Sequence, residues 1–227
     1  MANPQIGPAK SLERLTLVLA GVLIFKVTIG IIGNYPSYFP PDFRVDFLRG
    51  RRSYFFGAYQ WAFYAHLGSG PVAILLGLFL VNPSARRRFP ASHRVLGRVQ
   101  VLVVALLVAP SGLVMAFRPA AGPLAGIGLG LLAVLTASTA LMGGRLAVLG
   151  RFADHRRWMY RCFLLLCSAV VLRLSVGLAT VIGNPPTWVD PLATWLSWLV
   201  PLAAFEFRER GTRRPRRAKA QSDLPGR

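Results

Sequence analysis

Three histidines carry most of the chemistry that this sequence offers. His93 opens the stretch His93-Arg-Val-Leu-Gly-Arg98, and His155 lies in the stretch Asp154-His-Arg-Arg-Trp-Met-Tyr-Arg161; a long apolar segment begins at each. His66 lies inside another apolar segment. An imidazole nitrogen can bind haem iron, and helix bundles hold b-type haem in this way. His66, His93 and His155 are therefore candidate axial ligands of a b-type haem, or contacts for a quinone.

Four cations are candidates for holding an anionic group of such a ligand. Arg98 and Arg161 each lie one helical turn after another arginine, so each shares a helix face with a second cation. Lys26 and Arg173 lie inside apolar segments, as His66 does. At 1.5 Å per helical residue, these last three are expected roughly 21 Å from the cytoplasmic ends of their segments, and so in one layer.

No acidic residue lies in the middle of an apolar segment, so the charge of that layer needs a partner from elsewhere. Asp42 or Asp46 could fold down from a long loop, or Asp190 could reach in from the start of the last apolar segment. Water could also enter the layer. The remaining alternative is a bound anionic ligand, such as a haem propionate, a quinone oxygen or a lipid phosphate.

The two histidine-arginine stretches also have a purely structural interpretation. They stand where helices are expected to begin at a membrane surface, so their side chains could hydrogen-bond carbonyl groups and lipid phosphates and thereby lock neighbouring helices. Asp154 is expected to cap the helix that follows it. The residues alone leave the structural lock and the ligand site open.

The elements that must position these residues are membrane helices. Of the 227 residues, 54% are hydrophobic and only 15% are charged, with a mean hydropathy of +0.48, and several apolar runs exceed the roughly 18 residues that cross a bilayer. The sequence predicts an all-α membrane protein with a bundle of about six transmembrane helices. The expected spans are 12–32, 58–80, 95–117, 123–142, 158–182 and 191–207.

The predicted domain organisation is a single membrane domain, 12–207, between two tails. Residues 1–11 form a cytoplasmic N-terminal tail, and the basic segment 208–227 is expected to be a disordered cytoplasmic tail. The long loop, about 33–57, is rich in aromatic and charged residues and is expected to lie at the membrane surface. Gly122, Gly126 and Gly130 repeat every fourth residue, which predicts close packing against a neighbouring helix.

The net charge of +19 does not indicate nucleic-acid binding, because the basic residues lie in short links between apolar runs and in the C-terminal tail. Most of the 27 Lys and Arg residues fall on one side of the predicted membrane topology. The positive-inside rule then places both termini in the cytoplasm. The expected partners are the lipid bilayer, anionic lipids at the basic cytoplasmic face, and a membrane subunit partner or a second copy in a homo-oligomer.

Four segments together resemble a known family. They are Tyr64-Ala-His66-Leu-Gly-Ser-Gly-Pro71, the stretch from His93 to Arg98, the stretch from His155 to Arg161, and Leu172-Arg173. In order and spacing they resemble the bacterial membrane proteins of domain-of-unknown-function family 2306, over about residues 58–180. The resemblance implies location in the bacterial inner membrane. It also implies these signature positions: His66, His93, Arg94, Gly97, Arg98, His155, Arg156, Trp158, Met159, Arg161 and Arg173.

The residues and the resemblance favour a membrane redox or redox-accessory protein. It would bind b-type haem or quinone between the second, third and fifth spans, in a layout similar to two-haem b-type cytochromes and ferric-reductase-like domains. Two alternatives stay open. One is a non-catalytic membrane protein that binds anionic lipid or a partner subunit, and the other is a small anion transporter with Lys26, His66 and Arg173 as its site.

Overall fold

The computed structural model describes residues 8–183 and 186–222. Regular structure in these residues is helical, apart from an isolated bridge between Tyr38 and Pro41. Five of the described helices are long and apolar enough to cross a membrane. They are Arg14–Ser37, Ala58–Val81, Pro90–Ala116, Gly122–Val148 and Phe152–Ala179. The expected all-helical membrane fold is confirmed.

The last expected span differs from the prediction. Residues 191–207 lie inside one helix, α10 (Val189–Ser222), which is not among the five. The backbone of α10 continues to Ser222, so most of the segment that was expected to be a disordered tail is helical; residues 223–227 lie outside the described residues.

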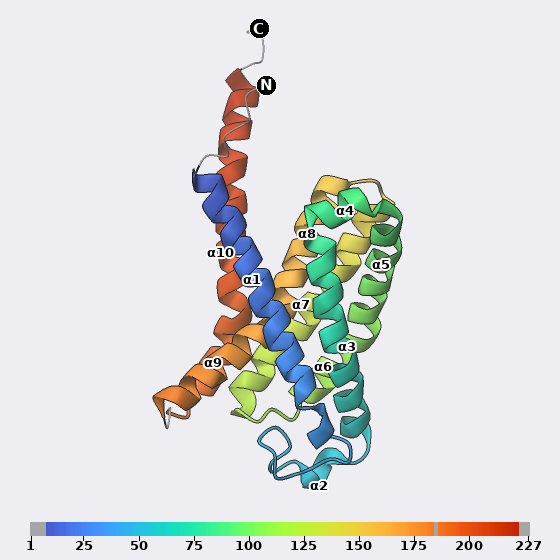
Figure 1. Cartoon of the computed structure of the whole chain (residues 1–227), viewed down its shortest axis with the longest axis vertical. Helices are drawn as coiled ribbons and strands as arrows, with labels where there is room; N and C mark the ends of the chain where they lie inside the picture. Colours follow the sequence, from blue (N-terminus) through green and yellow to red (C-terminus); the bar gives the residue numbers. More distant parts are fainter. Residues whose placement is uncertain (1–7, 184–185, 223–227) are drawn as a thin grey trace. The chain divides into compact units, whose positions relative to one another are not determined.

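The chain divides into two compact units, residues 1–115 and 116–227. Unit 1 contains these elements: α1 (Pro8–Gly33), η1 (Tyr35–Ser37), α2 (Arg52–Phe55), α3 (Ala58–Val81), α4 (Pro83–Arg88), α5 (Pro90–Val103), the π-helical turn η2 (Val104–Val108) and most of α6 (Ala109–Ala116). Within this unit α3 and α5 run antiparallel, with the short α4 joining them (Figure 1).

Local chemistry explains where the helices of unit 1 begin. The side chain of Asn82 caps α4 by accepting a hydrogen bond from the backbone N–H of Ser84 at 2.9 Å. Pro83 and Pro90 occupy the first positions of α4 and α5, where a missing N–H costs nothing.

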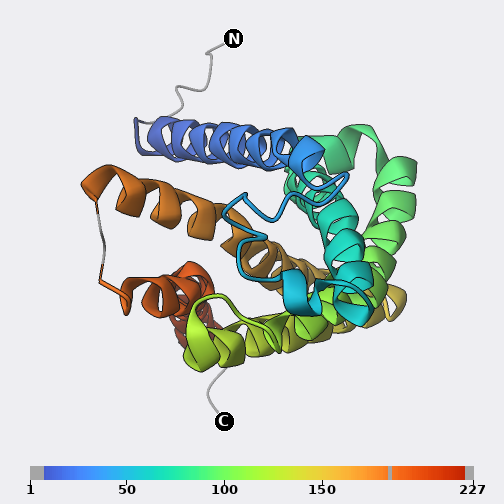
Figure 2. The same ribbon diagram turned by 90° about the horizontal axis from the view of Figure 1, so that it is seen from below.

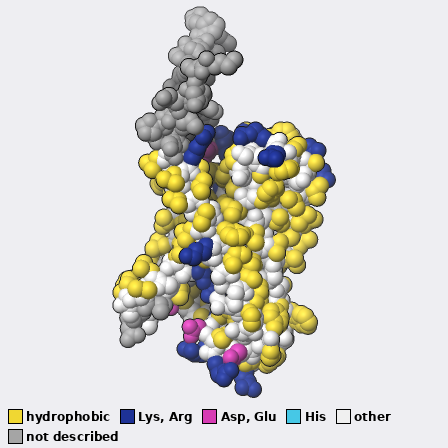
Figure 3. All heavy atoms as spheres, viewed as in Figure 1, with side chains coloured by type: hydrophobic (Ala, Val, Ile, Leu, Met, Phe, Trp, Pro, Cys, Tyr) yellow, Lys and Arg dark blue, Asp and Glu magenta, His cyan; other side chains and the backbone are white. Residues whose placement is uncertain are grey.

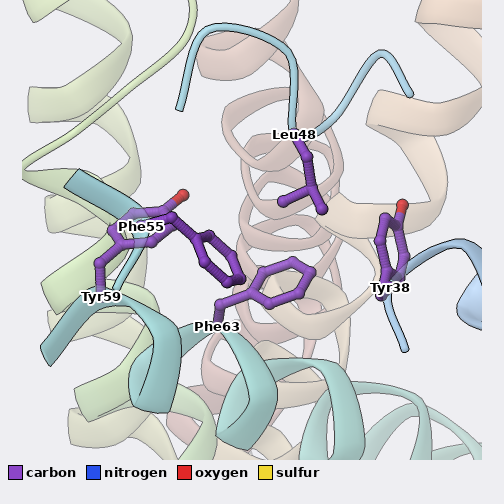
Figure 4. Close-up of a cluster of buried hydrophobic side chains, with 5 residues drawn as sticks. All are labelled: Tyr38, Leu48, Phe55, Tyr59 and Phe63. Atoms are coloured by element: carbon purple, nitrogen blue, oxygen red, sulfur yellow. The ribbon is translucent and has the colours of Figure 1, made fainter. Parts of the chain in front are cut away.

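The long loop folds against the start of α3, and Figure 2 views this loop from below. Its core is an aromatic cluster to which Tyr38, Leu48 and Phe55 contribute from the loop side and Tyr59 and Phe63 from α3. Their side chains converge in Figure 4, and the ring centroids of Phe55 and Phe63 are 5.6 Å apart. The loop therefore has a buried aromatic core of its own.

A buried arginine supports the same cluster. The Arg51 side chain is only 7% exposed, and its Nε donates to the carbonyl of Phe47 at 2.6 Å. Its guanidinium also lies 4.6 Å from the centroid of the Phe47 ring and donates to the hydroxyl of Tyr59. A cation as well as apolar contacts therefore holds the loop against the start of α3.

Unit 2 contains α7 (Gly122–Val148), α8 (Phe152–Leu166), α9 (Ser168–Ile182) and α10. The predicted span 158–182 is interrupted at Cys167, the residue between α8 and α9. The carbonyl of Cys167 accepts hydrogen bonds from both Val170 and Val171, which is typical of a distorted turn in a helix.

Two glycines at the start of α7, Gly126 and Gly128, pack closely, but against two different surfaces, whereas a Cβ on Gly122 would meet no atom within 4 Å. A Cβ on Gly128 would lie 3.0 Å from the indole of Trp195 on α10, which is a neighbouring helix. A Cβ on Gly126 would instead meet the carbonyl of Ala116 at 2.8 Å and the ring of Pro119 at 2.9 Å, both in the link that precedes α7. The indole N–H of Trp195 donates to the carbonyl of Leu124 and fastens α10 to this corner.

On the face that Figure 3 shows, many hydrophobic side chains are exposed along the helices, and most of the visible Lys and Arg side chains lie towards helix ends. This distribution fits helices that lie in lipid, where exposed apolar side chains lose nothing and charges are costly.

Candidate functional site

His66 on α3 is held by the helix opposite it in unit 1. Its Nδ1 lies 3.1 Å from the carbonyl oxygen of Val108 and 3.1 Å from the hydroxyl oxygen of Ser111. Val108 and Ser111 lie on either side of Pro110, which has no N–H to continue the helical ladder. The chain widens into the π-helical turn just before this proline, and the N–H of Ala109 bonds to the carbonyl of Val104.

These contacts fix the tautomer of a neutral His66 ring. The Val108 carbonyl can only accept a hydrogen bond, and the Ser111 hydroxyl already donates to the carbonyls of its own helix, at 2.5 Å for Leu107. The proton must therefore be on Nδ1, and Nε2 carries the lone pair.

His155 on α8 is held in the same way in unit 2. Its Nδ1 lies 2.8 Å from the carbonyl oxygen of Gly143 on α7, so it donates to that oxygen and leaves the lone pair on Nε2. The two helices approach closely at this point: a Cβ built on Gly143 would lie only 2.5 Å from the sulfur of Met159. The helix-locking contact that the sequence suggested for this stretch is therefore present at His155.

His93 lies apart from His66. It is half-buried in the first turn of α5, and Val108, which His66 contacts, lies fifteen residues further along the same run of helix. That separation corresponds to roughly 22 Å. His66 and His93 therefore cannot share one ligand. His155 belongs to unit 2 and is described there by itself.

Arg161 already has an acidic partner within unit 2. Its guanidinium donates to the two carboxylate oxygens of Glu206 on α10, at 2.5 and 3.1 Å, and lies 4.9 Å from the ring centroid of Trp158. Arg157 pairs with Glu209 at 2.9 Å, one helical turn away on both helices. These two ion pairs join α8 to α10. The charge of Arg161 is therefore paired with a carboxylate of the same unit.

Lys26, Arg98 and Arg173 have exposed side chains, and no acid lies within ion-pair distance of them among the described residues. Asp42 and Asp46 pair with Arg44 and Arg49 in the long loop, so neither folds down to Lys26. Lys26 and His66 belong to unit 1 and Arg173 to unit 2, so the single layer of three stays a prediction.

The electrostatics of the long loop keep Asp42 at the surface. Hydrogen bonds from the Arg44 side chain and backbone lower the pKa of Asp42 below its ordinary value, and the same pairing raises the pKa of Arg44. The carboxylate is therefore stabilised in its charged form where it stands.

The structure adds residues that the sequence did not single out. Glu206 was not a candidate because it lies at the end of an expected span. Ser111 and Gln100 were not candidates because each is a single uncharged polar residue in an apolar run. Gln100 is 1% exposed and donates from Nε2 to the carbonyl of Ala73 at 3.0 Å. Its position seven residues after His93 is the signal that could have placed both on one helix face.

Among the described residues, no three His, Cys, Asp or Glu side chains come together in a group that could hold a metal ion. Cys162 and Cys167 are free buried thiols. A haem, which needs only one or two imidazole ligands, does not require such a cluster.

Long apolar helices, charges at their ends and polar contacts between helices define the class of this molecule as a polytopic helical membrane protein. The comparison with protein families gives the same answer. The profile of the family described as "Predicted membrane protein (DUF2306)" matches residues 63–207, and the chain belongs to that family. This confirms the resemblance and extends it beyond residue 180. No curated protein and no solved structure matches the chain.

Proposed function

We propose that this membrane protein is a redox or redox-accessory protein that binds b-type haem or quinone, with His66 and His155 as the residues that hold the ligand. One observation supports the proposal: both rings donate Nδ1–H to a backbone carbonyl of a neighbouring helix and keep the Nε2 lone pair. Axial histidines are commonly oriented by such a hydrogen bond to their second nitrogen.

The donor chemistry fits either ligand. An Nε2 lone pair can bind haem iron, and the Nδ1–H hydrogen bond fixes the ring and increases its basicity. The same lone pair can accept a hydrogen bond from the hydroxyl of a quinone in its reduced form. A bound haem would supply a one-electron carrier, and the chain would orient it and exclude water. One histidine in each unit has this arrangement, so each unit is assigned its own ligand contact.

The same histidine contacts could serve only to lock neighbouring helices together, without a ligand. An absorption spectrum distinguishes this structural role from haem binding. We expect protein purified from haem-replete cells, or supplied with haemin, to show a Soret band. His66→Ala and His155→Ala should each lose much of this band. The matched control His93→Ala, which removes an imidazole from a different layer of unit 1, should keep it. A short-chain ubiquinol, tested by thermal shift against wild type and the same variants, covers the quinone alternative.

Two results would contradict the proposal. One is a protein that stays colourless with haemin and is not stabilised by the ubiquinol. The other is binding that is the same in wild type and in both His66→Ala and His155→Ala. A loss of stability in these variants without any ligand signal would instead identify the two histidines as helix locks.

A second candidate function is the binding of anionic lipid at the end of unit 1 that carries α4. Arg87, Arg88, Arg94 and Arg98 are exposed there, and no acid pairs with them in the described part of the chain. Each such charge near a membrane surface contributes about 1 kcal/mol to the attraction of anionic lipid.

The double variant Arg94→Gln/Arg98→Gln should therefore bind phosphatidylglycerol about thirtyfold more weakly, since two charges correspond to about 2 kcal/mol. Native mass spectrometry of protein in mixed micelles measures the bound lipid, with phosphatidylcholine as the neutral reference. Arg44→Gln is the matched control, because Arg44 is already paired with Asp42. An equal loss in this control would show that the effect depends on net charge and not on this surface.

A further inference from the structure

The face of α5 that packs inside unit 1 is unusually polar for a membrane helix. Gln100 and Val104 are fully buried, and His93 and Gly97 are half-buried. At 100° per residue these four positions fall within about 60° of one another around the helix. The opposite side is exposed at these five residues: Arg94, Val95, Arg98, Val99 and Leu102. His93 and Gln100 therefore lie on one line, two helical turns apart.

The side-chain nitrogen of Gln100 has a hydrogen-bond partner and its side-chain oxygen has none among the described residues. Its Nε2 donates to the Ala73 carbonyl of α3, and this orientation is fixed because a carbonyl can only accept. Within the described residues no donor reaches Gln100 Oε1, which is buried. Buried polar atoms nearly always have a partner, and an internal water commonly supplies it.

The same helix face is open at Gly97, which lies between His93 and Gln100 along α5. A Cβ built on Gly97 would have no atom within 4 Å. The neighbouring wall of α3 offers small residues, since Ala73 and Gly77 are both buried there. This open position offers room beside the helix, and the buried Oε1 of Gln100 offers a polar partner for water.

We propose that His93, Gly97 and Gln100 line a water-filled inlet that runs from the α4 end of unit 1 to Gln100. Its depth along α5 is about 10 Å, the rise of two helical turns. Water in the inlet donates to Gln100 Oε1, and His93 stands at the mouth, where its imidazole can exchange protons with that water. The inlet is independent of the ligand proposed for His66 and His155.

Cysteine accessibility tests the inlet in the full-length protein. In a Cys162→Ala/Cys167→Ala background, Gly97→Cys and Gln100→Cys are treated with a membrane-impermeant methanethiosulfonate bearing a trimethylammonium group. The membranes are opened by freeze–thaw, so that the reagent reaches both faces. Val99→Cys and Leu102→Cys are the matched controls, because these positions lie at similar depth but are 40% and 57% exposed on the outside of the helix, where lipid covers them.

We expect the cysteines at 97 and 100 to react at least tenfold faster than those at 99 and 102. The charged reagent needs water, and a thiol in lipid does not ionise. Equal rates at all four positions, or no reaction at 97 and 100, would overturn the proposal. Gly97→Cys keeps the test decisive if Gln100→Cys folds poorly, because it leaves the Gln100–Ala73 hydrogen bond intact.

Discussion

Replacement of Arg161 by alanine is expected to lower the free energy of unfolding by about 2–3 kcal/mol. The Arg161 side chain is 17% exposed and that of Glu206 33%, so removal of the guanidinium takes a two-point charged partner away from a carboxylate that is shielded in part from solvent. The variant also loses the cation–π contact with Trp158. The partial exposure of Glu206 keeps the expected loss below that of a fully buried pair.

Unfolding in mixed micelles with increasing SDS measures this loss. Arg173→Ala is the matched control, since it removes another arginine of unit 2 that is exposed and has no acidic partner among the described residues, and it should change stability by less than about 0.5 kcal/mol. Glu206→Gln and the double variant complete a cycle that isolates the pair energy. A coupling energy near zero would show that the ion pair does not hold α8 against α10.

Replacement of Gly126 by alanine should cost about 2 kcal/mol, although alanine normally favours a helix by up to about 1 kcal/mol over glycine. The new Cβ would lie 2.8 Å from the carbonyl oxygen of Ala116 and 2.9 Å from the ring of Pro119. Both belong to backbone or to a rigid ring, so neither can move aside as a flexible side chain would. The link before α7 has to shift instead.

Gly177→Ala is the matched control for this prediction. Gly177 lies inside α9, and a Cβ there would meet no atom within 4 Å, so the same substitution should be neutral or stabilising. The SDS titration described above measures both variants. Two variants that change stability alike would mean that the link does not pack against Gly126 as the structure shows.

The apolar runs were enough to predict most of the helices, because length and hydropathy alone decide whether a segment crosses a bilayer. The break at Cys167 was not predictable, since no proline or glycine marks it in the sequence. The packed long loop was also missed. Its order depends on contacts between Leu48, Phe55 and Phe63, which lie on separate segments and meet only when the chain folds back on α3.

The candidate site, like the fold, was predictable from the sequence only in part. The scarcity of histidine selected His66, His93 and His155 as candidates from the sequence, and the structure describes carbonyl partners for two of them, His66 and His155. Their carbonyl partners could not be inferred, because every residue carries a carbonyl and only the widened turn before Pro110 and the close approach at Gly143 present one to a ring. Arg161 was expected to hold an anionic ligand, and the structure pairs it with Glu206 on a distant helix.

By itself, the sequence determined the class of protein, the family and the residues that could bind a ligand, since hydropathy, charge and motif spacing are local properties of the chain. Only the tertiary structure decided which of those residues are already satisfied. Arg161 is paired with Glu206, and His66 and His155 keep a lone pair on Nε2. The structure also revealed Gln100, which the sequence had not singled out, with a buried acceptor. The physical reason is that hydrogen bonds and ion pairs form between helices, and their partners are set by packing over distances that sequence spacing does not encode.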